Sequence, residues 1–213
     1  MVHDVTGPSS RRPLTSRDTA WAKGLASRLA ASRITPNQIS AASVGFALLG
    51  LLCFCGAANS GRLLEALLLL LAAGTIQARL LCNLMDGMVA IEGGRSGPTG
   101  PFWNEAPDRA VDILFLWGAG IAAGQPALGL ACAALAVTTA YLRELGRAEG
   151  LPPDFSGPMA KPQRMAALTI GCLAAAFYAP AWTLSLALWI ILAGTSATIL
   201  RRTLRLHRSL NRR

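Results

Sequence analysis

Long uncharged stretches alternate with short charged segments along most of this chain of 213 residues. Residues 39–58 are apolar and long enough to cross a bilayer, which takes about 20 apolar residues in a helix. Residues 63–85 form a second candidate span, interrupted by Glu65 and Arg79 near its two ends. Hydrophobic residues make up 53% of the chain and charged residues only 15%, too few to cover a water-soluble domain. Because Ala and Leu dominate, the composition predicts an all-α, polytopic membrane protein.

Two further stretches, residues 113–142 and 165–200, contain no charged residue. Each is too long for one ordinary span and rather short for two. Each also has a break near its middle, at residues 124–126 (Gly-Gln-Pro) and at residues 178–180 (Tyr-Ala-Pro). The pattern alone therefore permits either one span or a hairpin of two spans in each stretch.

The distribution of basic residues favours the hairpins. With single spans, the loop that carries Arg143, Arg147, Lys161 and Arg164 would face outward, against the positive-inside rule. With hairpins, every basic loop lies on one side of the membrane and only Arg62 lies on the other. We therefore predict six transmembrane helices in the cell membrane, with both termini and the active site on the cytoplasmic side.

The region before the first span has a different pattern. Trp21, Leu25 and Leu29 recur at helical spacing, and Thr15 and Asp18 resemble a capping box. This pattern indicates an amphipathic juxtamembrane helix on the membrane surface, with a solvated linker helix as the alternative. The expected organisation is a flexible tail over residues 1–14, the amphipathic helix over 15–33, a six-helix transmembrane catalytic domain over 34–202 and a basic tail over 203–213.

The net charge is +9, from 20 basic and 11 acidic residues. In a membrane protein such an excess favours contacts with anionic lipid headgroups. Aromatic residues make up only 6% of the chain and do not alternate with the basic clusters, so we expect no nucleic-acid partner. The two histidines, His3 and His207, lie in the terminal segments, which argues against histidine general-base chemistry.

Five of the 11 acidic residues fall within one short segment, residues 86–112. Two oxygen-rich helical faces lie in this region, because their members are three or four residues apart. The members are Asn83 and Asp86 on one face, and Asn104, Asp108 and Asp112 on the other. Such hard oxygen ligands suit magnesium, manganese or calcium better than zinc. The alternative is that these acids only cap helix ends and offset arginines.

The residues between the two faces are rich in glycine, which suits a tight loop whose backbone approaches a phosphate. The whole segment from Asn83 to Asp108 resembles the signature of the CDP-alcohol phosphatidyltransferases, D-x2-D-G-x2-A-R-x8-G-x3-D-x3-D. The spacing matches without a gap. Asn83 and Asn104 stand at the first and third aspartates, and Ile91 stands at the arginine, so the chain resembles a variant of this signature. A register with a four-residue insertion would instead make Asp108 and Asp112 the final pair.

The resemblance implies transfer of a phosphatidyl group from CDP-diacylglycerol to a small polar alcohol or alcohol phosphate, with release of CMP, in phospholipid biosynthesis. It also implies Mg²⁺ or Mn²⁺ as cofactor, a CDP-linked lipid donor, contacts with membrane lipids and a homodimer. The implied metal ligands are Asn83, Asp86, Asn104, Asp108 and Asp112. The implied base is Asp108 in the gap-free register and Asp112 in the shifted one. The implied donor-binding positions are Gly87, Ala90, Gly100 and Asn37, the last from a Thr-Pro-Asn segment that the family also has before its first span.

Three basic residues near the ends of the expected spans, Arg143, Lys161 and Arg164, are candidates for binding the acceptor phosphate or the donor headgroup. The alternative is that they are only positive-inside anchors. Two acids outside the signature, Glu105 and Asp112, are candidates to restore the negative charge that the two asparagines remove.

Other functions remain open from the sequence. Intramembrane prenyltransferases also place acidic helix ends around magnesium, but they are larger bundles. The two asparagines and the lost arginine are also compatible with a degenerate homologue that binds a CDP-lipid or a partner without turnover. Within the family, transfer of a CDP-linked headgroup to a lipid is the alternative reaction.

Overall fold

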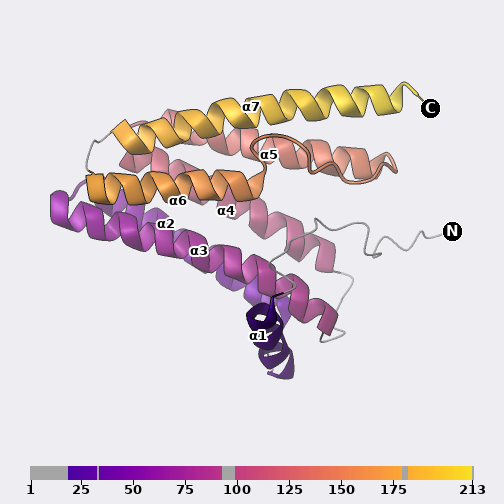
Figure 1. Ribbon diagram of the computed structural model, residues 1–213, viewed down its shortest axis with the longest axis horizontal. Helices are drawn as coiled ribbons and strands as arrows, with labels where there is room; N and C mark the ends of the chain where they lie inside the picture. The colour runs from indigo at the N-terminus through magenta and orange to yellow at the C-terminus, as the bar shows by residue number, and fades with distance from the viewer. Residues whose placement is uncertain (1–18, 33, 93–98, 179–181, 213) are drawn as a thin grey trace.

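The computed structural model describes residues 19–32, 34–92, 99–178 and 182–212, and seven helices lie within these ranges. A short helix comes first and six long ones follow (Figure 1). The helices are α1 (Ala20–Ala31), α2 (Pro36–Ala57), α3 (Arg62–Glu92), α4 (Gly100–Ala122), α5 (Pro126–Ala148), α6 (Lys161–Tyr178) and α7 (Trp182–Leu210).

Local sequence signals fix several helix ends. At the start of α2, the Thr35 hydroxyl accepts from the Gln38 amide at 3.2 Å, while the Thr35 amide donates to the Gln38 side chain at 2.9 Å. This reciprocal capping box satisfies two amides that the first turn leaves unpaired. Between α4 and α5, Gly124 adopts a positive φ of 69° and Pro126 begins the next helix. The break expected at residues 124–126 is therefore confirmed, and residues 113–142 form a helical hairpin.

The six long helices form a closed ring. Going round it, α2 contacts α3, α3 contacts α6, α6 contacts α7, α7 contacts α5, α5 contacts α4, and α4 contacts α2. The core inside the ring is a continuous apolar cluster that includes Phe54, Phe115, Leu168 and Leu188. Figure 1 shows the long helices lying along the same direction, with α1 at one end of the bundle.

Small residues allow the closest helix contact. A Cβ atom added to Gly129 of α5 would lie 2.5 Å from the Leu116 carbonyl oxygen of α4, and one added to Gly120 would lie 2.8 Å from the Gly129 Cα. Glycine is needed here because the two backbones touch, which is the usual way in which membrane helices pack.

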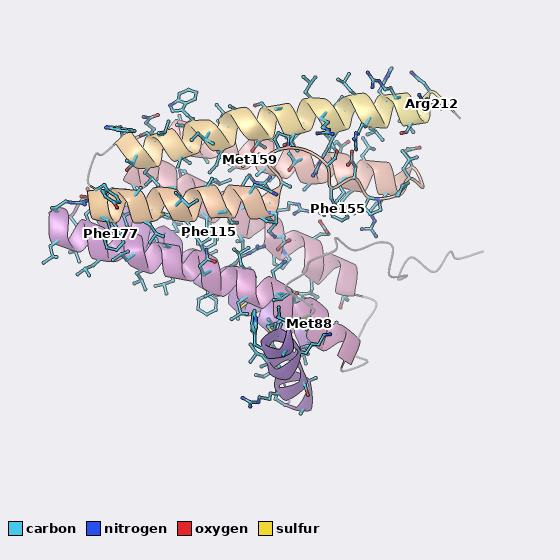
Figure 2. All side chains as sticks on the ribbon, in the orientation of Figure 1. Met88, Phe115, Phe155, Met159, Phe177 and Arg212 are labelled. Carbon is cyan, nitrogen blue, oxygen red and sulfur yellow. The ribbon has the colours of Figure 1, made fainter. Side chains whose placement is uncertain are left out.

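The outer surface of the ring is as apolar as its core. Leu52, Ile170 and Phe177 are among many large apolar side chains exposed on the outside, and Figure 2 labels Phe177 at one end of the bundle. Within the described ranges, four helices, α2, α3, α5 and α7, are long and apolar enough to cross a membrane. The chain therefore has the character of a polytopic membrane protein. Charged residues in the first half of α4 and in the first turn of α6 lower the hydropathy of these two helices, so the count of six spans stays a prediction.

The N-terminal helix is present as α1, and Leu25 and Leu29 of the expected apolar stripe pack against the bundle. Ala22 and Ala26 are buried against Leu84 and Met88 of α3, and Trp21 remains exposed. Small alanines allow α1 to lie close to α3. The expected tail and the Thr15–Asp18 capping box lie outside the described residues, and the position of α1 on a membrane surface stays a prediction. At the other terminus α7 continues to Leu210, so most of the expected basic tail is helical.

Candidate active site

Because the helices alternate in direction, the polar ends of α3, α4, α5 and α6 meet at one end of the ring. Asp86 is near the end of α3, and its carboxylate accepts a hydrogen bond of 2.9 Å from the Ser40 hydroxyl of α2. Asp108, in the first half of α4, lies close enough to Asp86 for the two carboxylates to interact electrostatically. One residue from each oxygen-rich face expected from the sequence, Asp86 and Asp108, therefore lies at this end of the ring.

Both carboxylate oxygens of Asp108 contact cations. One oxygen pairs with the Arg79 guanidinium of α3, and the other pairs with the Lys161 ammonium of α6. The Asp108 side chain is 19% exposed, whereas Arg79 is fully buried. Asp108 therefore joins three helices and remains partly exposed.

Asp112, one turn further along α4, has a different environment. Its carboxylate pairs with Arg164 of α6 at 2.9 Å, and the two side chains are 1% and 3% exposed. Arg164 also donates to the Thr139 hydroxyl at 3.4 Å and to the Met159 carbonyl oxygen at 3.3 Å. This enclosed pair holds α4, α5 and α6 together, which is a structural task.

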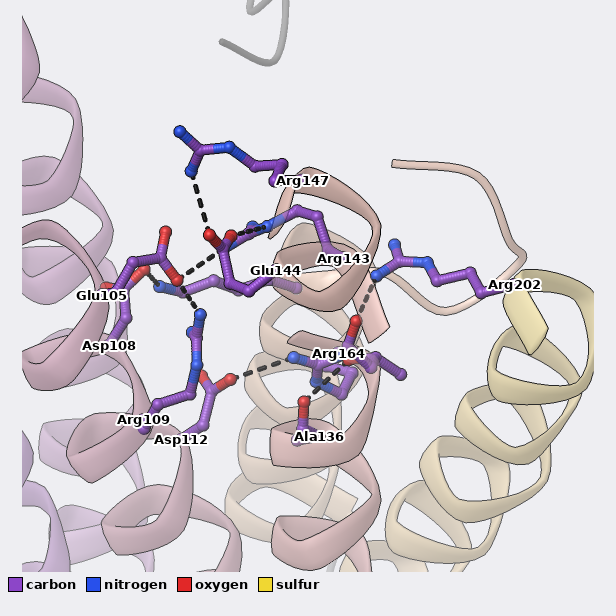
Figure 3. Close-up of polar contacts among 12 residues, drawn as sticks. Glu105, Asp108, Arg109, Asp112, Ala136, Arg143, Glu144, Arg147, Arg164 and Arg202 are labelled. Atoms are coloured by element: carbon purple, nitrogen blue, oxygen red, sulfur yellow. Dashed lines mark hydrogen bonds and ion pairs between the residues drawn. The ribbon is translucent and has the colours of Figure 1, made fainter. Parts of the chain in front are cut away.

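An open network of charges lies at the rim of the site (Figure 3). Glu105 of α4 pairs with Arg109 of the same helix and with Arg143 of α5, the latter at 2.5 Å. Arg143 and Arg147 both pair with Glu144. The two acids expected to restore charge, Glu105 and Asp112, are therefore both compensated by arginines.

The remaining expected site residues lie at the same end of the ring. They are Asn83, Gly87 and Ala90 on α3, Asn37 in the first turn of α2, and Gly100 as the first residue of α4. The side chains of Asn104 and Ile91 and the loop over residues 93–98 are outside the described part. A Cβ added to Gly100 meets no atom within 4 Å, so there is open space beside the start of α4.

The described residues suit one divalent cation better than a cluster of them. No group of three or more His, Cys, Asp or Glu side chains that could hold a metal occurs in the described part of the chain. The available donors are the carboxylates of Asp86 and Asp108 and the amide oxygen of Asn83. Such hard oxygen donors fit Mg²⁺ or Mn²⁺, and the ammonium of Lys161 shows that a cation is accommodated against Asp108.

A second polar feature is a groove of about 470 Å³ beside the site, between the ends of α5 and α7 and the loop that joins α5 to α6. Arg143, Arg202, Arg205, Arg208 and Arg212 line it, together with Asp154. Arg202 donates to the Ser156 carbonyl oxygen at 3.0 Å and to the Thr139 carbonyl oxygen at 2.7 Å, and so fixes the loop to α5.

Comparison with known proteins now adds to this geometry. No family profile matches the chain. Over 132 residues, 28% are identical to the phosphatidylinositol phosphate synthase of Mycolicibacterium smegmatis, a match covering 58% of this chain and 59% of that protein. The chain thus spans less than two thirds of the length of this relative. Over the matched part, the chain is thus similar in sequence to a phosphatidylinositol phosphate synthase.

Solved structures share the fold of this chain. The chain superposes with a TM-score of 0.72 on Mycobacterium tuberculosis phosphatidylinositol phosphate synthase in complex with manganese and citrate, at 20% identity over 86% of this chain and 88% of that one. A structure of the same enzyme with CDP-DAG bound gives a TM-score of 0.72 at 19% identity, over 86% of this chain and 92% of that one.

Some residues of the candidate site were not expected from the sequence. Arg79 appeared only as an interruption of an apolar span, although an ionisable residue inside such a span is itself a sign of function. Ser40 gave no signal, because a lone serine in an apolar helix is common. Arg202 is one of many basic residues near the C-terminus, so its role in fixing the loop over residues 151–160 is visible only in the fold.

Proposed function

We propose that this protein transfers a phosphatidyl group from CDP-diacylglycerol to a small polar alcohol or alcohol phosphate, with release of CMP. The relative that shares 28% identity is named for a reaction of this class, and the superposable structures include one with CDP-DAG bound. The observation that carries the proposal is the position of Asp108. It ends the family signature, lies beside Asp86, and contacts Lys161 from a third helix.

Asp108 acts as the general base in this proposal. Its carboxylate takes the proton of the acceptor hydroxyl, the acceptor oxygen attacks the phosphatidyl phosphorus, and CMP leaves with the bond electrons. Asp108 is partly exposed whereas Asp112 is enclosed and paired with Arg164, which supports the gap-free register. Asp112 then acts as a structural residue at the edge of the site.

The metal site of the proposal consists of Asp86 and Asp108, with the Asn83 amide oxygen as a neutral ligand. A divalent cation bound there, Mg²⁺ or Mn²⁺, would neutralise charge on the donor diphosphate as the reaction proceeds. The superposable structure with manganese supports this choice of metal. Gly87, Ala90, Gly100 and Asn37 surround this end of the ring and are proposed to contact the donor.

Lys161 is the proposed ligand for the acceptor or its phosphate. Its ammonium pairs with the partly exposed carboxylate of Asp108, and the Lys161 side chain is 20% exposed, whereas the Arg164 side chain is 3% exposed. Arg143 lies nearer the rim and is the second candidate. The acceptor is proposed only by class, as a small polar alcohol or alcohol phosphate.

The site is proposed to open to the cytoplasm and sideways to the bilayer, since one substrate is water-soluble and the other is a lipid. The basic rim supports this orientation through the positive-inside rule. Six spans, cytoplasmic termini and a homodimer stay predictions.

The test is CMP release from CDP-diacylglycerol by the purified full chain in detergent, with Mn²⁺ or Mg²⁺ and a panel of alcohols and alcohol phosphates. Release should require the metal and disappear with a chelator. Asp108→Asn should lower the rate by at least about 100-fold, because it removes the base. Glu65→Gln is the matched control, since Glu65 lies in the first turn of α3, at the opposite end of that helix.

Two other outcomes would change the proposal. Loss of activity in Asp112→Asn, with Asp108→Asn still active, would move the base one turn along α4. Absence of CMP release with every acceptor, together with measurable binding of CDP-diacylglycerol, would favour the degenerate homologue and reject the transferase.

A further inference from the structure

Arg79 is the largest fully buried side chain in the described part of the protein, and its charge lies inside the candidate site. It is on the same face of α3 as Asn83, four residues on, and Asp86, seven residues on. Its guanidinium pairs with Asp108 of α4. A fixed positive charge therefore lies between the two helices that carry the family signature.

The guanidinium is not fully satisfied. Its Nε and one terminal nitrogen are buried and have no hydrogen-bond partner among the described residues. A buried charge with unpaired donors is costly, so a position that serves only packing would favour an apolar residue. The charge of Arg79 also acts on Asp86 and on Lys161. These interactions indicate that its task is electrostatic.

The charges around the site are balanced without a metal. Asp86 and Asp108 contribute two negative charges, and Arg79 and Lys161 contribute two positive ones. Asn83 and position 104 are neutral where the family signature has aspartates. Glu105 and Asp112 do not restore that charge, because arginines pair with both. A second divalent cation would therefore lack carboxylate ligands and would be repelled by the guanidinium.

We infer that Arg79 takes the place of a second divalent metal, so that the site binds one divalent cation per chain. Arg79 is a positioning residue: it acts through Asp108 and through its field on the donor diphosphate. The inference rests on the proposed function for its catalytic meaning. The number of divalent cations bound per chain, in contrast, can be measured on the protein without substrates.

The test measures Mn²⁺ binding to the purified full chain, without substrates, from the electron paramagnetic resonance signal of free Mn²⁺. The wild type should bind one Mn²⁺. Arg79→Met should bind Mn²⁺ more tightly, by about tenfold or more, because a fixed positive charge is gone. Adding Asn83→Asp and Asn104→Asp to Arg79→Met should create a second Mn²⁺ site. Arg62→Met, at the first residue of the same helix, is the control and should bind like the wild type.

Arg79→Lys keeps the positive charge, and it is the second variant in case Arg79→Met does not fold. It should retain one Mn²⁺ with an affinity close to that of the wild type. Two sites of similar affinity in the wild type, no Mn²⁺ binding at all, or equal affinities in the wild type and Arg79→Met would each overturn the inference. CMP release is a separate measurement. One Mn²⁺ with the expected response to Arg79→Met but no CMP release would reject the transferase and leave the inference about the metal intact.

Discussion

The Asp112 carboxylate and the Arg164 guanidinium form an ion pair of 2.9 Å in which both side chains are almost fully buried. The pair links α4 to α6, and Arg164 extends it to Thr139 of α5. Three helices that enclose the candidate site thus depend on one charge pair. The second Asp112 oxygen and the Arg164 Nε are also buried, and neither has a hydrogen-bond partner among the described residues.

Asp112→Ala should therefore destabilise the protein strongly. Removing one partner leaves a buried guanidinium unpaired, which typically costs about 3–5 kcal/mol. Thermal unfolding in detergent measures this loss. Asp112→Ala combined with Arg164→Met should recover much of the stability, because no uncompensated charge remains. If the double variant were no more stable than Asp112→Ala, the pair would not be the cause.

Gly129→Ala should also destabilise the protein, for a steric reason. The new Cβ would lie 2.5 Å from the Leu116 carbonyl oxygen, so α4 and α5 must move apart, at a cost of about 1–3 kcal/mol. Gly74→Ala is the matched control, because its Cβ would meet no atom within 4 Å. Alanine favours a helix interior by up to about 1 kcal/mol, so the control should be neutral or stabilising in the same unfolding assay. Equal effects of the two changes would show that close packing at Gly129 is unimportant.

The helices and their order could be predicted from the sequence because the signals are local. The uncharged stretch over residues 39–58 and the break at Pro126 mark helix ends within a few residues of their observed positions. The position of α1 was harder to predict from the sequence. The apolar stripe indicated the side of Leu25 and Leu29, which do pack against the bundle, but the fully buried contacts with α3 are made by Ala22 and Ala26, which carry little hydrophobic signal.

The candidate site was predictable only in part. Spacing along one helix places Asn83 with Asp86, and Asp108 with Asp112, because helical periodicity is fixed. Which residues meet across helices depends on the ring. Lys161 contacts Asp108, while Arg164, one turn away, contacts Asp112. The sequence alone allows these four residues to be grouped, but it does not show which carboxylate pairs with which basic side chain.

Asp154 should give the loop between α5 and α6 an acid-sensitive stability. Burial raises the pKa of Asp154, but hydrogen bonds from Ser156 and the charges of Arg202 and Arg205 outweigh it and hold the pKa below its usual value of 3.8. A lowered pKa stabilises the folded state above 3.8, and this contribution is lost as the pH falls below that value. Because Asp154 is partly exposed, the effect is at most about 1 kcal/mol.

The measurement is thermal unfolding of the wild type and of Asp154→Asn between pH 6 and pH 3. The wild type should be the more stable at pH 6, and the difference should shrink toward pH 3. A difference that stays constant over this range would mean that the carboxylate charge makes no contribution.

Lys161→Met should strengthen the binding of Mn²⁺ and raise the KM for an acceptor phosphate. The ammonium contacts one oxygen of Asp108, so a divalent cation must compete with it for that carboxylate. Without the ammonium, Mn²⁺ should bind about tenfold more tightly, as measured by titration of free Mn²⁺. The same variant should raise the KM for an acceptor phosphate in the CMP-release assay, because the proposed anion ligand is gone. Lys23→Met, which changes the only other lysine in the chain, should leave both quantities unaltered. Weaker Mn²⁺ binding in Lys161→Met would mean that the lysine supports the metal site and does not compete with it.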